Sequence, residues 1–476
     1  MDKKRNRKTS RHSTVSRRDF MKMLGLGSVG AGAAALGLSP VMPFADLDDM
    51  MSSEFSSRKL PFWIKEVDKP TVEIDYDQIE RFPNVYKTLF LPEPYGGMEK
   101  FGARVQRHIG GTAKQILDGT VTIQDFALAD CGAYEDVTST VPWLGTDMPH
   151  SPTAMLAYGP EDLGVPRYNG TPEESSQMLR VAARIFGAFD VGFVKLDEKM
   201  KKFLYANVVF EDVDEGYASE DGRLILPDKD LWVITGAIPQ SQFMSQYNMW
   251  GGAHAHAYSS ASQYAAKMKT FLHGIGYQGY GQGHTDVGLA IPFGVHSGIA
   301  EYSRTGQMCS PILGTDFRTV ILTITDLPLA PSKPIDAGIF KFCESCKKCA
   351  EECPGGAISM DDKPSWITRD THNNPHQTTY GVKGYLIDPM KCVDQMYTGT
   401  TLCHTCSVVC PFNKFDKASL HQIINGVIGT TPVANKLIRS LDDVFGYGMK
   451  TAEESKAANL WEMDQWDVPL YGLDRV

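Results

Sequence analysis

Residues 342–354 read FCESCKKCAEECP, and residues 392–411 read CVDQMYTGTTLCHTCSVVCP. These two runs hold eight of the ten cysteines, and each ends in Cys-Pro. The first run has the spacing C-x2-C-x2-C-x3-C-P, which binds a 4Fe-4S cluster. The second run keeps this spacing except for a first gap of ten residues. Together they predict a domain that holds two 4Fe-4S clusters.

The spacing also divides the cysteines between the two clusters. Two-residue gaps let successive thiolates reach corners of one cluster from a single tight loop, whereas the cysteine after the three-residue gap starts a helix and points elsewhere. In two-cluster ferredoxins this fourth cysteine ligates the other cluster. We therefore expect the first cluster on Cys343, Cys346, Cys349 and Cys410, and the second on Cys392, Cys403, Cys406 and Cys353.

Two other uses of so many cysteines fit this pattern less well. Secreted proteins favour disulfides, but disulfide frameworks do not reproduce this spacing. Zinc sites seldom place four thiolates in this order before a proline. Cys131 and Cys309 lie outside both runs, and we expect each to be a small buried hydrophobic residue rather than a ligand.

The start of the chain predicts an export signal over residues 1–45. Residues 1–22 carry nine Lys or Arg against two acidic residues and include Arg17-Arg18, and residues 23–45 are uncharged. This arrangement is typical of a twin-arginine signal; a basic tail before a membrane-spanning helix is the alternative. Without residues 1–22 the formal charge changes from −10 to −17, which opposes binding to nucleic acid.

The middle of the chain predicts alternating helices and strands. Thr171-Pro172-Glu173-Glu174 combines an N-cap, a proline at the first helical position and a capping box. Strands are expected at 191–196, 231–234 and 319–325, and a helix at 257–273, before a glycine-rich turn. Such alternation argues for an α/β or α+β core. The proline-rich segment 327–336 then predicts a boundary before the cluster domain.

Several of these segments together resemble the respiratory reductive dehalogenases. They are SRRDFMK, TPEESSQMLRVAARIFGA, HSGIAEYSRTG, TDLPL, KPIDAGI and the two cysteine runs. The resemblance implies an α+β fold in four parts. These are a signal peptide (1–45), a nitroreductase-like corrinoid-binding core (46–330), a ferredoxin-like domain with two 4Fe-4S clusters (331–425) and a C-terminal extension that packs on the core (426–476).

The same resemblance implies an activity and three catalytic residues. The family passes electrons through two 4Fe-4S clusters to a Co(I) corrinoid and replaces carbon-bound halogen with hydrogen. Tyr258 corresponds to the proton donor, and Arg304 in AEYSR corresponds to the cation that assists it, although Ala300 and Ser303 stand where glycines are usual. A third polar position maps near His284. A phenol has a pKa near 10, so a fixed cation such as arginine would stabilise the phenolate left after proton donation.

The other histidines are expected to have structural roles. No D-x-H-x-x-G motif that would place a histidine on cobalt is present, so the corrinoid is expected without such a ligand. His254, His256 and His296 are each expected to be satisfied structural residues.

The resemblance also implies partners, a location and a substrate. The expected partners are a small organohalide, a small membrane-anchor subunit, a respiratory electron donor and the twin-arginine translocase, and the family allows a homodimer. The expected location is the outer face of the cytoplasmic membrane. The default substrates are chlorinated ethenes such as tetrachloroethene or trichloroethene.

Two alternatives to a dehalogenase remain. The epoxyqueuosine reductase type is similar in pairing a corrinoid with two clusters, but it acts on tRNA in the cytoplasm, which the leader and the acidic charge oppose. An exported two-cluster electron-transfer protein would not need the long segment 46–330.

Overall fold

The structure, a computed structural model, describes residues 60–61, 63–81, 98–119, 122, 159–246, 250–281, 287–368, 380–398, 403–413, 419–430, 435–444 and 460–462. The predicted export signal, Cys131 and His284 lie outside these ranges. Among the described residues, no helix combines the length and apolar character that crossing a membrane requires.

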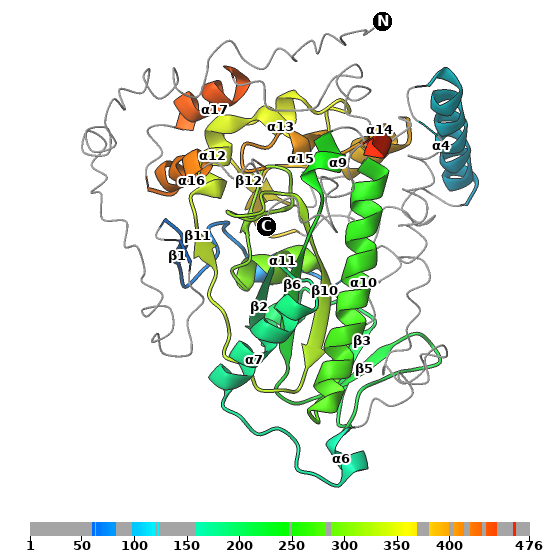
Figure 1. The fold of residues 1–476 in the computed structure, drawn as a ribbon, viewed down its shortest axis with the longest axis vertical. Coiled ribbons are helices and arrows are strands. Elements are labelled where there is room, and N and C mark those ends of the chain that lie inside the picture. Colours follow the sequence, from blue (N-terminus) through cyan, green and yellow to red (C-terminus); the bar gives the residue numbers. More distant parts are fainter. Residues whose placement is uncertain are drawn as a thin grey trace, which may run out of the picture.

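A four-stranded antiparallel sheet forms the centre of the core (Figure 1). In spatial order its strands are β2 (Asp190–Lys195), β6 (Trp232–Pro239), β10 (Phe317–Thr325) and β7 (Gly279–Tyr280). Val191 pairs with Gly236, and Val233 on the same central strand pairs with Ile324. The ladder between β10 and β6 shifts register between Arg318 and Ile321.

Helices cover both faces of this sheet. On one face, α7 (Pro172–Ile185) and α10 (Trp250–Gly274) pack through an apolar cluster that includes Leu179, Phe193, Ile234 and Met268. On the other face, α11 (Ala290–His296) contributes Phe293 to a second cluster around β6 and β10. The central strand β6 therefore buries side chains on both faces, which agrees with the apolar character of most of its residues.

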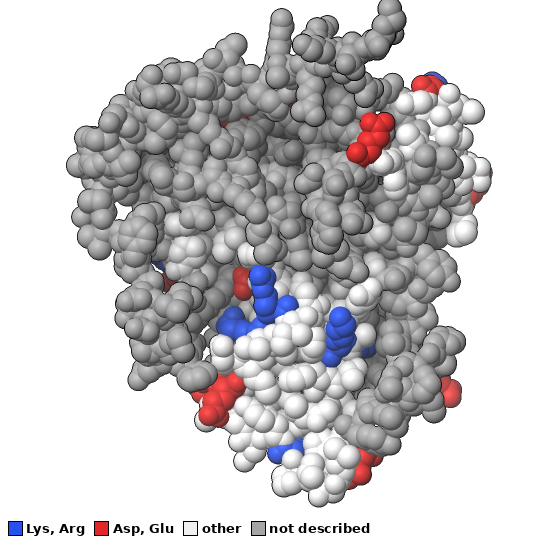
Figure 2. Space-filling model, viewed as in Figure 1, with Lys and Arg blue, Asp and Glu red and all other residues white. Residues whose placement is uncertain are grey.

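Smaller elements complete the core. Basic and acidic side chains are interspersed with uncharged ones over the described part of the face in Figure 2. The remaining elements before the cluster domain are η1 (Tyr76–Gln78), α4 (Met98–Asp118), α6 (Pro160–Leu163), α8 (Glu198–Lys201), α9 (Gln242–Gln246), β3 (Val208–Glu211), β4 (Tyr217–Ala218), β5 (Leu224–Pro227), β8 (Glu301–Tyr302) and β9 (Met308–Cys309).

The cluster domain consists of short helices joined by tight turns. Gly338 begins α12 with φ of 74°, and a Cβ there would lie 2.6 Å from the Ile428 carbonyl oxygen, so the position requires glycine. Lys347 turns the chain with φ of 55° between Cys346 and Cys349. The elements are α12 (Ile339–Cys346), α13 (Lys348–Glu351), β12 (Ser365–Ile367), β13 (Val382–Gly384), α14 (Pro389–Thr398) and α15 (Thr405–Val408).

The described part of the C-terminal extension contacts both the cluster domain and the predicted core, because the apolar cluster that holds Ile428 also includes Trp63 and Ile64. Helices α16 (Ser419–Thr430) and α17 (Asn435–Val444) both contact α12. Ile428 joins an apolar cluster with Ile339 and Phe342 of α12, and Lys348 forms a buried ion pair with Asp442 of α17. The short helix η7 (Leu460–Glu462) is the last described element.

The proline-rich linker is held along its length. Ala330 N donates to Pro172 O at 3.2 Å, and Ser332 N donates to Phe193 O at 2.8 Å, which ties the linker to α7 and β2. Farther along, β11 (Ile335–Asp336) pairs with β1 (Lys65–Glu66). The proline-rich segment at the predicted boundary is therefore hydrogen-bonded along its length and is not a free linker.

Candidate iron-sulfur and catalytic site

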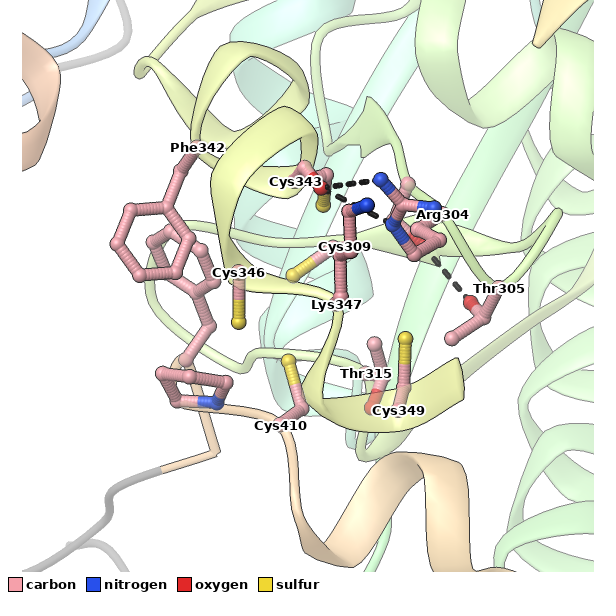
Figure 3. Close-up of a pocket in the computed structure, with 13 residues that line it drawn as sticks. Arg304, Thr305, Cys309, Thr315, Phe342, Cys343, Cys346, Lys347, Cys349 and Cys410 are labelled. Carbon is pink, nitrogen blue, oxygen red and sulfur yellow. Dashed lines mark hydrogen bonds between the residues drawn. The ribbon is translucent and has the colours of Figure 1, made fainter. Parts of the chain in front are cut away.

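One cavity collects the four cysteines assigned to the first cluster. Cys343 and Cys346 lie on α12, Cys349 lies on α13, and Cys410 follows α15. Their side chains line one cavity (Figure 3). The structure thus places these four thiols together, although Cys410 is more than fifty residues from the others in sequence.

The four cysteines assigned to the second cluster also lie close together. Burial raises the pKa of Cys406 above its ordinary range, and the neighbouring thiols of Cys392, Cys403 and Cys353 raise it further. Burial raises the pKa of Cys392 to about 11, again with contributions from Cys403 and Cys353. These effects indicate that the four thiols lie near one another, and that Cys410 of the first set also lies near Cys406.

The cysteines suit clusters better than single ions or disulfides. No described cysteine forms a disulfide. Within the described ranges, no three His, Cys, Asp or Glu side chains converge tightly enough for one metal ion, whereas a four-iron cluster needs its thiolates spread over four corners. Burial raises the pKa of Cys346 to about 12, so the buried thiols need bound iron to hold them as thiolates.

Arg304 is buried against the same cavity and is 1% exposed. Its Nε and Nη2 donate to the Cys343 carbonyl oxygen at 3.0 and 2.9 Å (Figure 3). Its Nη1 donates to Ser359 O at 2.7 Å. Its guanidinium carbon lies 3.7 Å from the centre of the Tyr385 ring. These bonds join the loop after β8 to the first cysteine loop.

The other two predicted catalytic residues are placed differently. Tyr258 lies on α10, is partly buried, and packs against the apolar cluster between α10 and the sheet. His284 lies outside the described residues. The structure therefore brings Arg304 to the cluster cysteines, whereas Tyr258 packs against the sheet side of its helix.

His296 has the structural role expected of it. Its Nδ1 donates to Pro292 O at 2.7 Å, and its Nε2 accepts from the Tyr76 hydroxyl at 2.7 Å. Burial lowers the pKa of His296, which favours the neutral ring that this pair of bonds requires. His256 Nε2 is buried without a partner among the described residues. The helix that carries His254 is described, but the side chain of His254 is not.

Sequence reasoning missed Glu301, a buried carboxylate beside the cluster domain. Glu301 is 1% exposed, and its Oε2 accepts from Ala337 N at 2.9 Å and Ile339 N at 3.0 Å. Its Oε1 accepts from the Thr71 hydroxyl at 2.8 Å. A glutamate between alanine and tyrosine carries no local sign of this role, because every partner lies at least 36 residues away.

A second missed feature is a polar layer where β6 and β10 approach the cluster domain. Gln240 and Asp316 are 1% and 0% exposed. Gln240 Nε2 lies 2.9 Å, and Asp316 Oδ1 lies 3.4 Å, from His404 Nε2. Neither Asp316 oxygen nor Gln240 Oε1 accepts a hydrogen bond from the described residues. Buried acceptors without donors cost about 1–3 kcal/mol each, so the layer suits a ligand rich in N–H groups.

Comparison with known proteins agrees with this architecture. Residues 342–413 match the 4Fe-4S double cluster binding domain, so the fold and the cavity define an α+β protein with an iron-sulfur domain for two clusters. Residues 59–207 and 203–329 match the family model of the reductive dehalogenase subunit. The chain therefore belongs to the reductive dehalogenase family, whose members are oxidoreductases that act on carbon-halogen bonds.

Individual relatives match over most of the chain. The chain is 29% identical to the trichloroethene reductive dehalogenase of Dehalococcoides mccartyi strain 195, over 92% of this chain and 95% of that protein. It is 30% identical to the chloroethene reductive dehalogenase of strain VS, over 97% and 99%. The tetrachloroethene reductive dehalogenase of Sulfurospirillum multivorans is 29% identical over 64% and 61%.

A solved structure shares the fold. The catabolic reductive dehalogenase NpRdhA superposes with a TM-score of 0.55 at 20% identity, over 81% of this chain and 49% of that one. The family, expected from the sequence, is confirmed by the family model and the full-length relatives. The expected α+β fold with a double-cluster domain is confirmed by this structural match and the double-cluster model.

Proposed function

We propose that this chain replaces a carbon-bound chlorine of a chlorinated ethene with hydrogen, in anaerobic organohalide respiration. The observation that carries the proposal is the alignment over nearly the whole length of two proteins named as trichloroethene and chloroethene reductive dehalogenases. The cavity of converging cysteines beside a buried arginine supports it.

The two cysteine sets described above would hold the two 4Fe-4S clusters. The buried acceptors of Asp316 and Gln240 would receive N–H groups from the amide side chains at the edge of a corrinoid, and no histidine of the chain is assigned to its cobalt. When bound, a Co(I) corrinoid supplies the reductive cleavage of the carbon-halogen bond, with electrons from the clusters.

Within this scheme Tyr258 delivers the proton that replaces the halogen. A phenol does so readily only where a cation stabilises the resulting phenolate. Arg304 is proposed for this role because its charge is fixed and no carboxylate pairs with it among the described residues; its guanidinium bonds to the cluster domain, whereas Tyr258 packs against the sheet. A guanidinium has five N–H groups, and three of those of Arg304 bond to the cluster domain. His284 is proposed as a further polar residue of the pocket.

The decisive experiment measures halide release from trichloroethene. Anaerobically purified protein is loaded with clusters and cobalamin and reduced with methyl viologen. Tyr258→Phe is expected to abolish release. Tyr264→Phe is the matched control, because Tyr264 lies on the same helix and its buried hydroxyl has no partner in the described structure. Equal loss in both variants would remove Tyr258 from the proposal. Bound clusters without corrinoid or halide release would favour an exported electron carrier instead.

We also propose export by the twin-arginine route to the outer face of the cytoplasmic membrane, where a small anchor subunit would hold the protein. The Arg17-Arg18 leader supports this. Protease added to intact spheroplasts should degrade the wild type, whereas Arg17→Lys/Arg18→Lys should leave the protein protected inside. Degradation of both proteins alike would contradict the proposal.

A further inference from the structure

A buried cation lines the cavity of the first cluster, together with the buried Cys309 and the four predicted ligands. This cation is Arg304, which is 1% exposed and donates two hydrogen bonds to the carbonyl oxygen of Cys343 (Figure 3). The Tyr385 ring, centred 3.7 Å from the guanidinium carbon, stabilises the cation further. Because all of these partners are uncharged, they hold the guanidinium in place without neutralising it.

The other cations that belong to the first cysteine loop or bond to it are each paired with a carboxylate. These ion pairs are Lys347 with Asp362, Lys348 with Asp442, and Arg439 with Glu351. Among the residues that the structure describes, Arg304 has no Asp or Glu within ion-pair distance. The charge of Arg304 does reach Asp362, but that carboxylate is 89% exposed and lies 2.5 Å from Lys347 Nζ. Arg304 therefore adds a net positive charge at the wall of the cavity.

Arg439 makes a similar hydrogen bond but has a neutralising partner. Its Nε donates to the Cys346 carbonyl oxygen at 3.1 Å, and its Nη2 forms an ion pair with Glu351. The two side chains are 21% and 39% exposed, so water also screens their charges. Two arginines thus bond to carbonyl oxygens of two predicted ligands, and only Arg304 does so without a compensating negative charge.

We propose that the charge of Arg304 raises the midpoint potential of the cluster held by Cys343, Cys346, Cys349 and Cys410. The proposal rests on the cluster assignment made under the proposed function, and it is separate from the role of Arg304 toward Tyr258. A 4Fe-4S cluster bound by four thiolates is an anion, and one-electron reduction makes it more negative. A buried cation of fixed charge stabilises the more negative state more strongly, and net charge is among the determinants of cluster potential.

The test separates the charge of Arg304 from its hydrogen bonds. Arg304→Lys keeps a cation but not the fork of the guanidinium, whereas Arg304→Gln keeps an amide donor without a charge. Each protein is loaded anaerobically with clusters and cobalamin, its iron is counted, and its cluster potentials are measured by titration with dithionite monitored by EPR. We expect one cluster of Arg304→Gln to have a lower potential than in the wild type, and Arg304→Lys to stay near the wild type. The other cluster should shift less.

A double variant in the same loop is the matched control. Glu351→Gln/Arg439→Gln removes a guanidinium bond to a ligand carbonyl oxygen but leaves the net charge unchanged. Its potentials should therefore stay near those of the wild type. Tyr258→Phe should also keep the wild-type potentials. Since halide release plays no part in this readout, the proposed function can fail while the potential shift remains.

Three results would overturn the proposal. Wild-type potentials in Arg304→Gln would show that the charge has no effect. Equal shifts in Arg304→Lys and Arg304→Gln, or an equal shift in the double variant, would assign the effect to the hydrogen bonds. If Arg304→Gln does not load its clusters, the single variant Glu351→Gln decides. Removing this carboxylate leaves the charge of Arg439 uncompensated, so the potential of the same cluster should rise, and an unchanged potential would count against the proposal.

Discussion

Protonation of Glu301 should control how tightly α12 is held. The Glu301 side chain accepts hydrogen bonds from Ala337 and Ile339 at the start of the helix that carries Cys343 and Cys346. Burial raises the pKa of this carboxyl from its ordinary 4.5 to about 6, and the two backbone N–H groups only partly oppose the shift. Opening of this segment would admit water and return the pKa to its ordinary value.

The direction and size of the pH effect on this opening follow from the linkage between protonation of Glu301 and the opening. Because Glu301 keeps its proton to higher pH in the closed form, the extra stability of that form is complete below pH 4.5 and is lost as the pH rises through 6. A shift of one pKa unit corresponds to 1.36 kcal/mol, so the closed form loses about 2 kcal/mol, or about 30-fold in the opening equilibrium. About 8-fold of this change falls between pH 5 and pH 7.5.

Hydrogen exchange of the cluster-loaded protein measures the opening of the segment at the start of α12 directly. The protection of the Ala337 and Ile339 amides, corrected for intrinsic exchange rates, should fall about 8-fold from pH 5 to pH 7.5 in the wild type. Glu301→Gln cannot titrate, so its protection should stay constant. Glu301→Ala should lose protection at every pH, because it leaves buried N–H groups unpaired at a cost of about 1–3 kcal/mol each. A wild-type profile as flat as that of Glu301→Gln would refute the reasoning.

Three further variants test other contacts. Arg304→Lys should accelerate iron release to a chelator, because one ammonium cannot replace the three bonds of the guanidinium and a carbonyl left unpaired costs about 1–3 kcal/mol; an unchanged rate would contradict this. Asp442→Asn should destabilise the protein by about 3–5 kcal/mol, because it removes the carboxylate that forms an ion pair with the buried Lys348 ammonium, and Lys348→Met in the same chain should restore much of the lost melting temperature. Tyr76→Phe should cost about 1 kcal/mol by removing the hydrogen bond to His296, measured as the shift in melting temperature against the wild type at neutral pH.

Short sequence patterns correctly predicted the helices and strands whose hydrogen bonds join residues close together in the chain. The capping box appears as expected, with Glu174 N donating to the Thr171 hydroxyl at 3.2 Å and Thr171 N donating to Glu174 Oε2 at 2.8 Å. The three predicted strands correspond to β2, β6 and β10. The helix expected at 257–273 begins earlier, at Trp250, because its first turns contain glycines and small residues that give no apolar stripe.

Contacts between distant parts of the chain could not be predicted in the same way. The cysteine spacing predicted which thiols bind the same cluster, because short gaps between cysteines let their thiolates reach the corners of one cluster. Nothing comparable marks Cys309, whose neighbour Cys410 is about a hundred residues away, or Asp316, which meets His404 across the boundary between core and cluster domain. Such positions depend on how the sheet and the cluster domain pack, and burial decides their chemistry.

The linker, which is hydrogen-bonded to the core, affects the rate of electron transfer between the core and the cluster domain. Electron tunnelling slows steeply with distance, so two redox groups on hinged domains would exchange electrons over a spread of distances, with the rate set by rare close approaches. Here Ala330 and Ser332 are bonded to α7 and β2, and β11 is paired with β1. The core and the cluster domain are thus fastened at several points along the joining segment. Under the proposed function, electron transfer between the clusters and a corrinoid in the core should therefore proceed over one fixed gap, with a rate set by driving force and insensitive to solvent viscosity.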